Sequence, residues 1–258
     1  MQERINFKVD FQVHLHRGNY SLRDVLQKME QKGLKGIAVL SHPHENYLSR
    51  WFLRTRKGEY SIDEDTKIIK ARNRENGGKF YLFLGQEIES SGGFHLLDIG
   101  RISGYRSDAR KPLEAYIEEG LADNRILIFD HPYADPTRKF ADLEPEKEKE
   151  LIKIAEKYGQ EIAFEWNAYS LPYIRALMPG YGNVNKKLER FASEYGLRII
   201  PTSDTHVRNK KLLNGIGTAH VSFPDSVDFS DENIYTSIKD KILKDNYDAH
   251  KSYVSFLH

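Results

Sequence analysis

Two histidines separated by one residue, His14 and His16, end an apolar run that begins at Val9. In an extended strand alternate side chains point to the same face, so the two imidazoles would project together from the end of the strand. Two imidazoles in this arrangement can hold one metal ion. A neutral histidine is also a common interior hydrogen-bonding residue, so the pair becomes informative only with the residues downstream.

Similar side chains stand at or just beyond the ends of other predicted strands, and one more lies on a strand predicted to pair with these. The full set is His14, His16, His42, Glu87, His95, His131, Asp204 and His206. On a parallel barrel the carboxyl ends of the strands form one face, and active sites in this architecture are built there. We therefore expect these side chains to lie together.

The chemistry of such a set is that of a metal site. The chain has no cysteine, so any metal must be held by imidazoles and carboxylates, which suit Zn, Mn or Fe. A carboxylate such as Glu87 can bridge two cations. Two cations about 3.5 to 4 Å apart can activate a water and clamp the oxygens of a phosphoryl group, which makes hydrolysis the natural reaction class.

The elements that must position these residues are strands that alternate with helices. Strands are predicted at 9–16, 36–40, 80–84, 94–99, 126–129, 162–165 and 197–201, with a further short strand at about 217–221. Helices are predicted at 21–33, 113–121, 144–157, 184–195 and 231–243. This alternation favours parallel pairing and right-handed crossovers, and about seven strands suggest an α/β, (β/α) barrel that is TIM-barrel-like. Residues 45–76 are interpreted as an insertion over the strand ends, helical from about Asp63.

Composition sets the remaining bounds. The 258 residues are 39% hydrophobic and 30% charged, with a net charge of +1, and we expect one domain over 1–258. The near-neutral charge argues against a protein built mainly to coat nucleic acid. No apolar stretch is long enough to span a bilayer, and Met1 leads into polar residues rather than a secretory signal, so a cytoplasmic location is expected.

Short motifs follow one another along almost the whole chain: His14-Leu15-His16, Leu40-Ser41-His42, Gly85-Gln86-Glu87-Ile88, Phe94-His95-Leu96-Leu97, Asp130-His131-Pro132-Tyr133, Glu165-Trp166-Asn167 and Ser203-Asp204-Thr205-His206. Together and in this order, they resemble the motifs of the PHP family, named for polymerase and histidinol phosphatase. The run from Asn214 to Thr218 is also similar to a segment of small stand-alone members.

The resemblance implies a distorted seven-stranded (β/α) barrel that hydrolyses phosphoesters with two or three divalent metal ions. By position, the first cation would be held by His14, His16, Glu87 and Asp204, the second by Glu87, His95 and His131, and the third by His42 and His206. The resemblance also implies a metal-bridging hydroxide as nucleophile, which Asp204 would orient or deprotonate. Asp204, Glu87 and His206 are accordingly the expected catalytic residues.

The chain departs from the family at two acidic positions. The family usually carries Ser-Asp-Gly after its His-x-His motif, whereas the segment from Arg17 to Ser21 has no acid. The family's Thr-Asp-His is represented here by Ser41 and His42. Both missing acids concern the third cation, and His44 is one residue that could compensate.

Arginines near the strand ends are candidates for binding phosphate, because guanidinium groups match its oxygens. Arg17 directly follows His16, and Arg50 and Arg54 belong to a basic cluster in the insertion that also contains Trp51 and Phe52. This cluster could form a lid that stacks a base and holds a phosphate. The alternative is a solvated surface with aromatic residues turned to the core.

The leading hypothesis is a metal-dependent phosphoesterase that acts on a small phosphorylated metabolite or nucleotide. A hydrolase of a C–N or lactone bond is a second possibility, because other metal barrels use similar ligands. The missing acids suggest a third, a nucleic-acid or protein-binding module with a decayed metal site. A nuclease is an intermediate case, in which nucleic acid is a possible but not favoured partner.

Overall fold

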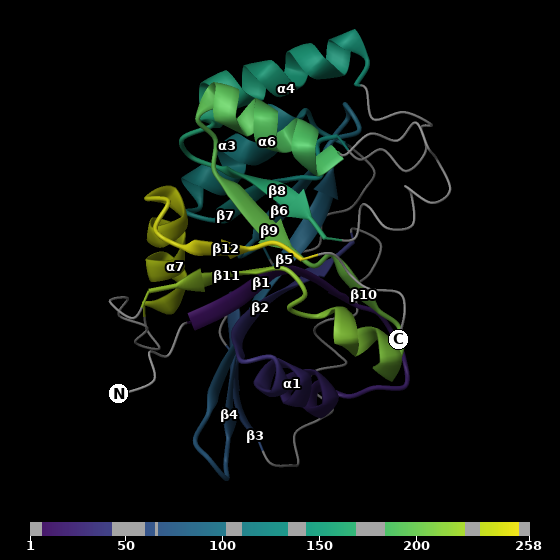
Figure 1. The fold of residues 1–258 in the computed structure, drawn as a ribbon, viewed down its shortest axis with the longest axis vertical. Coiled ribbons are helices and arrows are strands. Elements are labelled where there is room, and N and C mark those ends of the chain that lie inside the picture. The colour runs from purple at the N-terminus through teal and green to yellow at the C-terminus, as the bar shows by residue number, and fades with distance from the viewer. Residues whose placement is uncertain are drawn as a thin grey trace.

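One mixed sheet of twelve strands runs through the computed structural model of this chain (Figure 1). The structure describes residues 7–42, 60–64, 67–101, 110–133, 143–168, 184–224 and 233–252, with 60–64 described by backbone alone. The strands are β1 (Phe7–Leu15), β2 (Leu34–Ser41), β3 (Tyr60–Glu64), β4 (Ile68–Asn73), β5 (Lys79–Glu89), β6 (His95–Ile99), β7 (Ile126–Asp130), β8 (Ala163–Asn167), β9 (Ile199–Thr202), β10 (Thr205–Val207), β11 (His220–Phe223) and β12 (Asp248–His250). The helices are α1 (Leu22–Gln31), α3 (Leu113–Ala122), α4 (Pro145–Tyr158), α6 (Val184–Tyr195), α7 (Ile234–Leu243) and the 3-10 helix η2 (Lys210–Gly215).

The sheet nearly closes into a barrel. Its strands follow the order β12-β11-β1-β2-β5-β6-β7-β8-β9, and β10, which follows β9 after two residues, pairs in parallel with β1. The pairs β1–β2, β2–β5, β7–β8 and β8–β9 are parallel, whereas β6 is antiparallel to both its neighbours. The expected α/β class and nearly closed barrel are confirmed, but the sheet is mixed rather than parallel throughout, and the described residues form more strands than the seven expected.

The described part of the predicted insertion is a hairpin. Strands β3 and β4 pair with each other, and β4 pairs antiparallel with β5, so the helix expected from about Asp63 is wrong. Ile68, Ile69 and Ala71 are buried along β4 while Arg72 is exposed, so pairing with β5 prevails over the helical preference of a charged segment. Residues 43–59 lie outside the described residues.

The helices form where side-chain spacing predicts. Helix α1 begins after Ser21, whose hydroxyl caps the backbone NH of Asp24 while the Asp24 carboxylate accepts from the Ser21 NH. Its buried residues are the expected Leu22, Val25, Leu26 and Met29, and Gly33 ends the helix at a φ of 67°. The charge-dense helix α4 buries only the face formed by Leu151, Ile154, Ala155 and Tyr158.

Three apolar clusters hold the helices to the sheet. Helix α1 packs on β1, β2, β4 and β5, while α3, α4 and α6 cover β7 and β8 (Figure 1). Helix α7 packs on the cluster that contains Phe7, Val9 and Ile126. Its Tyr235 hydroxyl accepts a hydrogen bond from the Ile126 NH at the amino end of β7 and donates one to the Ile99 carbonyl. Helix α7 thus closes this end of the sheet and leaves the opposite end for the site.

Candidate metal centre

A bulge in β1 determines the direction in which His14 and His16 project from the strand end. The pairing register of β1 with β2 shifts between Asp10 and Val13. Before this shift Val9 and Phe11 face the central cluster, but after it Val13 and Leu15 pack on the α1 side. Because side chains alternate along a strand, His14 now takes the interior face, and a β-bulge is a common way to redirect a functional side chain.

The first group of potential ligands consists of imidazoles, and we call His14, His42 and His206 the imidazole group. The ring centroid of His14 lies 4.6 Å from that of His42 and 4.4 Å from that of His206, with nearly parallel planes. One nitrogen from each ring lies within 4.8 Å of the others. His16 joins this group through its Nε2, 3.0 Å from Nδ1 of His206.

The second group is richer in acid, and we call Glu87, His95, Asp130 and His131 the carboxylate group. Its four ligand atoms also lie within 4.8 Å of one another. His95 Nδ1 is 2.6 Å from Glu87 Oε1, and His131 Nδ1 is 2.8 Å from Asp130 Oδ1. His95 opens β6, opposite Glu89 at the end of β5 and Asp130 at the end of β7, so one edge of the sheet supplies the group.

Glu87 joins the two groups. Its Oε2 lies 3.1 Å from Nε2 of His14 and 3.8 Å from Nδ1 of His42, while its Oε1 faces His95. Burial raises the pKa of the Glu87 carboxyl, but the hydrogen bonds and charges of His14 and His95 outweigh burial and hold this pKa well below its usual range. The carboxylate is therefore ionised and can serve both groups.

Asp204 lies in the two-residue link between β9 and β10, with a φ of 47° that is uncommon for a residue with a Cβ. Its Oδ1 is 3.2 Å from Nε2 of His206 and 3.7 Å from Nε2 of His14, and its Oδ2 accepts a hydrogen bond from Asn167 at 3.0 Å. Burial raises the pKa of Asp204, and the contact with His206 reverses this shift and lowers the pKa. The strained link thus presents an ionised carboxylate beside the imidazole group.

His131 also has a left-handed backbone, with a φ of 23°, directly after the end of β7. Its NH donates to Oε2 of Glu165 at 2.9 Å, which fixes the turn. Burial would lower the pKa of the His131 ring, but the charge of Asp130 and then Glu165 hold this pKa well above its usual range. Uncommon backbone conformations of this kind concentrate at functional sites.

A buried polar network lies behind the two groups. Asn167 donates to both carboxylate oxygens of Glu165, at 3.2 and 3.3 Å, as well as to Asp204. Thr202 donates to Glu165 and lies 3.1 Å from Oε1 of Gln12. The network therefore connects β8 and β9 with β1, and it holds the acids that face the histidines.

The donor set fits divalent cations. Four buried or nearly buried carboxylates, those of Glu87, Asp130, Glu165 and Asp204, make no ion pair with a Lys or Arg among the described residues. The two buried carboxylate oxygens of Asp130 make no hydrogen bond of good geometry in this part of the chain, although Oδ1 lies 2.8 Å from Nδ1 of His131. Buried charge of one sign is costly unless it is compensated, and imidazole with carboxylate is a common ligand set for Zn, Mn and Fe.

The structure brings together all eight side chains expected from the sequence as ligands. His42 and His206, expected at a third cation, lie with His14 of the first. The acid-free segment after His16 has a structural role: the Tyr20 hydroxyl donates to the Val207 carbonyl at 3.0 Å, which ties β1 to β10. A Cβ on Gly18 would meet the Arg208 carbonyl oxygen at 2.2 Å, so this turn requires glycine.

The candidate substrate residues are only partly described. Arg17 is exposed beside His16 at the rim of the site. Arg50 and Arg54, with the rest of their basic cluster and His44, lie outside the described residues.

Sequence reasoning missed three residues of the site: Asp130, Glu165 and Asn167. Asp130 ends β7 and Asn167 ends β8, while Glu165 is the middle residue of β8 but ends the strand predicted at 162–165, so the rule that found the other ligands could have found them. They lie within the motifs of the PHP resemblance but match none of the ligand positions that this resemblance implies.

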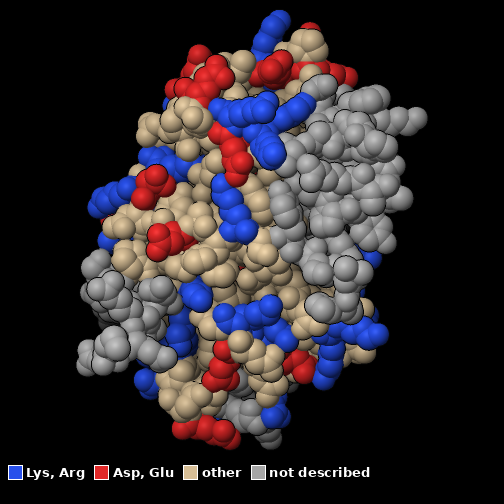
Figure 2. Space-filling model, in the orientation of Figure 1, with Lys and Arg blue, Asp and Glu red and all other residues tan. Residues whose placement is uncertain are grey.

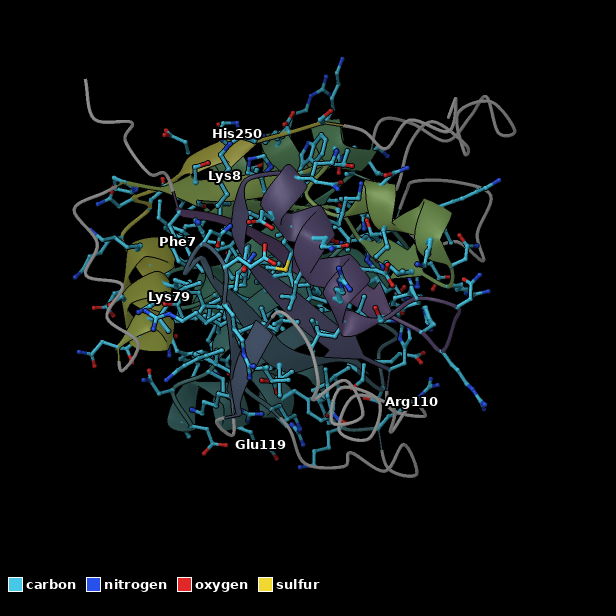
Figure 3. The ribbon with its side chains drawn as sticks, turned by 90° about the horizontal axis from the view of Figure 1, so that it is seen from below. Phe7, Lys8, Lys79, Arg110, Glu119 and His250 are labelled. Atoms are coloured by element: carbon cyan, nitrogen blue, oxygen red, sulfur yellow. The ribbon has the colours of Figure 1, made fainter. Side chains whose placement is uncertain are left out.

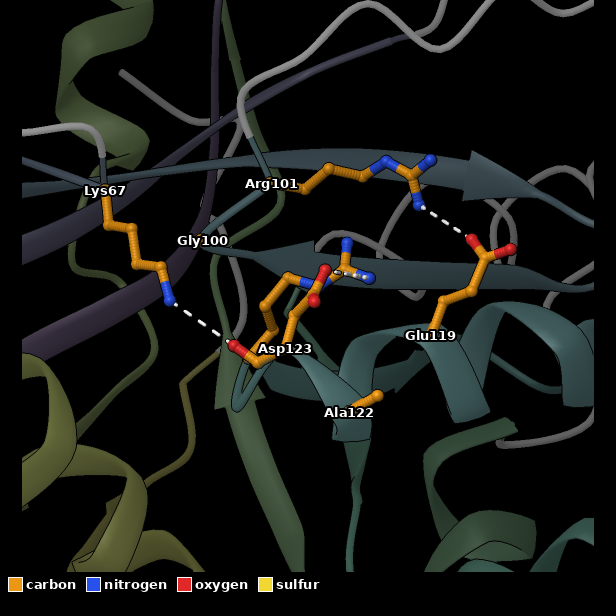
Figure 4. A pocket seen from close by; sticks show the side chains of 7 residues that line it. Lys67, Gly100, Arg101, Glu119, Ala122 and Asp123 are labelled. Atoms are coloured by element: carbon orange, nitrogen blue, oxygen red, sulfur yellow. Dashed lines mark hydrogen bonds and ion pairs between the residues drawn. The ribbon is translucent and has the colours of Figure 1, made fainter.

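A separate cavity of about 560 Å³ lies near the amino end of β7, opposite the end that carries Asp130 (Figure 4). Its two arginines are paired with acids, since Arg101 lies 3.7 Å from Glu119 and Arg125 lies 2.6 Å from Asp98, while Lys67 donates to the Asp123 backbone carbonyl at 3.4 Å.

The face of the molecule drawn in Figure 2 shows no continuous basic patch among the described residues. In the view of Figure 2, Lys and Arg are interspersed with Asp and Glu. His220 of β11 stacks on His250 of β12 with ring centroids 4.6 Å apart, and β11 pairs on its other edge with β1, where Lys8 lies opposite Ser222 (Figure 3). Among the helices in the described ranges, none combines the length and hydropathy of a membrane span.

Fold and site together define a nearly closed α/β barrel. Its potential metal ligands lie at the end of the barrel formed by the carboxyl ends of the parallel strands. A scan of the sequence finds no matching protein-family model and no matching curated protein. Solved structures with a similar fold include a Bacteroides vulgatus two-domain protein described as containing a predicted PHP-like metal-dependent phosphoesterase. The TM-score is 0.58 at 14% identity, over 96% of this chain and 65% of that one.

Two further structures are similar. The lesion-specific endonuclease PfuEndoQ from Pyrococcus furiosus has a TM-score of 0.58 at 14% identity, over 95% of this chain and 57% of its own. PsfC from Pseudomonas syringae has a TM-score of 0.51 at 16% identity, over 85% of this chain and 82% of its own. This chain thus spans less than two thirds of the length of the Bacteroides protein and of the endonuclease. These similarities and the nearly closed sheet confirm the α/β barrel expected from the PHP resemblance in its coarse form.

Proposed function

We propose that the chain is a metal-dependent hydrolase that cleaves phosphoester bonds, in a single domain over residues 1–258. The observation that carries this proposal is the position of Glu87, whose two oxygens face the imidazole group on one side and the carboxylate group on the other. A carboxylate shared in this way is suited to bridge two cations. Neighbours of the same fold described as phosphoesterase and endonuclease support the reaction class.

The proposed barrel has seven strands, if β9 and β10 count as one bent strand. The ring is then β1, β2, β5, β6, β7, β8 and β9 with β10, and it closes where His14 pairs with His206. Strands β3, β4, β11 and β12 are additions outside the ring. This description agrees with the distorted barrel that the family resemblance implies.

We assign one cation to the imidazole group, with His16 and Asp204, and another to the carboxylate group, with Glu87 between them. Zn, Mn and Fe all suit the donors. When bound, such ions lower the pKa of a water and neutralise charge on phosphoryl oxygens.

The side chains of the chain itself would hold the reacting groups. Asp204, oriented by Asn167 and placed on the strained link, is the candidate to orient a water or accept its proton. His206 contacts Asp204 and supports the orientation of this carboxylate. Arg17, at the rim beside His16, is the candidate to hold a non-reacting phosphate oxygen, and we expect the same of Arg50 and Arg54.

The favoured substrate is a small phosphorylated metabolite or nucleotide. The net charge of +1 and the mixed surface of Figure 2 give no support for a protein that coats nucleic acid. An endonuclease remains the second candidate, because PfuEndoQ has the same fold. A hydrolase of C–N or lactone bonds could use the same ligands, whereas the ordered acids around both groups argue against a binding module with a decayed metal site.

The test is an assay of phosphomonoesters, phosphodiesters and short DNA strands with Mn²⁺ or Zn²⁺, together with a panel of amides and lactones. Turnover of a phosphoester that Glu87→Gln abolishes would support the proposal. Metal-loaded protein that cleaves only amides or lactones would select the C–N or lactone hydrolase. Strongly salt-dependent cleavage of DNA would select the nuclease.

A further inference from the structure

Asp130 is the residue of the carboxylate group to which the family resemblance gives no role. We propose that Asp130 is itself a ligand of the cation held there, and that it makes this position prefer a harder, oxygen-seeking divalent cation such as Mn²⁺ over the cation of the imidazole group. This inference rests on the proposed function, since it concerns the same metal centre. It adds a ligand and a metal preference that the motifs do not supply.

Burial is the first argument. The side chain of Asp130 is 0% exposed, and the polar atoms of described residues that face its two oxygens are ring nitrogens of His131, at 2.8 Å, and His95, at 3.9 Å. Leaving a buried carboxylate without hydrogen bonds is strongly unfavourable. By contrast, the nearby Glu165 is also buried but accepts hydrogen bonds from the His131 NH, from Asn167 and from Thr202. Glu165 accepts from backbone, amide and hydroxyl donors of the protein, whereas Asp130, among the described residues, faces only two histidine rings that are themselves candidate ligands, so a cation among these groups would compensate its charge.

Direction is the second argument. Oδ1 of Asp130 lies 2.8 Å from Nδ1 of His131, and Oδ2 lies 3.9 Å from Nδ1 of His95, which in turn contacts Glu87. The carboxylate is thus turned toward the other members of the group. Opposed ligands of one ion, with bonds of about 2.0 to 2.2 Å, are about 4.4 Å apart, which is close to the 4.8 Å within which all four ligand atoms lie.

Composition gives the metal preference. The carboxylate group offers two acids and two imidazoles, whereas the imidazole group offers three rings, with Asp204 beside it. Imidazole suits Zn²⁺ and other late transition metals, and carboxylate oxygen suits Mg²⁺ and Mn²⁺. The two positions therefore differ in hardness. Glu87 serves both, so Asp130 accounts for the difference.

The rival explanation is that Asp130 only orients the ring of His131. A carboxylate that orients a ligating histidine typically changes metal affinity by about 10- to 100-fold when it is replaced. Asn at this position would keep an oxygen able to accept from the His131 ring, so Asp130→Asn would then retain both ions and the wild-type metal preference.

The experiment measures metal stoichiometry by mass spectrometry and binding of Mn²⁺ and Zn²⁺ by calorimetry, on the full chain. If Asp130 is a ligand, Asp130→Asn loses one ion per chain, and its affinity for Mn²⁺ falls more than about 100-fold, beyond the range of an orienting residue, while Zn²⁺ at the other position is retained. Electron paramagnetic resonance of the Mn²⁺ form should change from a spin-coupled pair to isolated ions. Glu165→Gln is the matched buried control and should retain two ions.

The remaining outcomes are separable. Asp130→Asn that keeps two ions and the wild-type preference for Mn²⁺ would overturn this inference and leave the proposed function intact. Wild-type protein that binds no ion would overturn the proposed function itself. If Asp130→Asn does not fold, as judged by circular dichroism, Asp130→Glu keeps a carboxylate. It should retain two ions with weakened Mn²⁺ binding, and unchanged Mn²⁺ affinity would contradict a ligand role.

Discussion

The imidazole group and the carboxylate group, which together form the two halves of the metal centre, lie at the same edge of the sheet but differ in their ligand types. The imidazole group gathers nearly parallel rings from β1, β10 and the end of β2, with Asp204 beside them. The carboxylate group brings two buried acids and two histidines from β5, β6 and the end of β7. The comparison teaches that strand ends fix where ligands gather, while the residue types decide which cation each half prefers.

Charge separates the halves further. In the carboxylate group, the charge of Glu165 raises the pKa of Asp130 beyond the effect of burial, whereas contacts with His206 lower the pKa of Asp204 beside the imidazole group. At the carboxylate group the acids Asp130 and Glu165 thus repel each other, whereas beside the imidazole group Asp204 is paired with the ring of His206. A cation should therefore stabilise the carboxylate half more strongly than the imidazole half.

The largest effect is expected for Glu87→Gln, because this carboxylate faces both halves. We expect both ions to bind weakly and turnover to fall by about 10³-fold or more, with the fold retained. Metal analysis and a phosphoesterase assay measure this, with the exposed Glu118→Gln on α3 as control. If the variant lost only one ion and kept its rate, Glu87 would not connect the halves.

Asp204→Asn should act on one half. The change removes the charge beside His14 and His206, so we expect turnover to fall by about 10²- to 10³-fold and the ion of the imidazole group to bind more weakly. The ion of the carboxylate group should remain. Metal titrations of this variant and of the exposed Asp123→Asn compare the two cases, and equal loss of both ions would contradict independent halves.

Asn167→Ala tests the network that both halves share. It removes the donor to Glu165 and Asp204 without removing a ligand, so a decrease in turnover of about 10- to 100-fold is expected at unchanged metal stoichiometry. Steady-state kinetics and metal counts are the measurements, with Asn76→Ala in an exposed turn as control. Loss of an ion would show that Asn167 supports binding of the metals as well as their use.

The smallest effect on the metal centre is expected for a histidine outside both halves. Burial first, and then His250 and Lys8, lower the pKa of His220 to about 4. The unfolded chain, with a pKa of about 6.5, therefore binds more protons between these values, so the contribution of His220 to stability is present above pH 6.5 and is lost as the pH falls toward 4.

His220→Asn should remove this part of the pH dependence and leave the metal content unchanged. Nuclear magnetic resonance titration of His220 and melting temperatures at about pH 4.5 and pH 7.5, on either side of the unperturbed histidine pKa, are the measurements. A normal pKa for His220 would contradict its burial, and lost metal would place this residue in the centre.

The carboxyl ends of the strands were predictable from the sequence, because an apolar run followed directly by His, Asp or Glu marks where a buried strand stops. The capped helix α1 and its buried face were equally clear. The sequence could not show that a bulge between Asp10 and Val13 turns His14 inward, because a register shift depends on the pairing of β1 with β2. The charge pattern also predicted a helix where β4 forms, because tertiary pairing with β5 decides the structure there.

The sequence also could not predict which of the expected ligands lie close together. Short motifs named the eight expected ligands, but only the folded sheet shows that His42 and His206 lie with His14 and that Asp130 lies with His131. Distances of this kind depend on strands that are far apart in the chain. For the same reason the role of Tyr20 in tying β1 to β10 was not foreseen.

Counting the divalent ions bound per chain tests the central claim most directly. Wild-type protein, purified with Mn²⁺ and Zn²⁺ supplied and then freed of loosely bound metal, should retain two ions per chain by mass spectrometry, one for each ligand group. Anomalous scattering from crystals of the same material should place them on either side of Glu87. Protein that retains no ion, or ions located away from Glu87, would contradict the account.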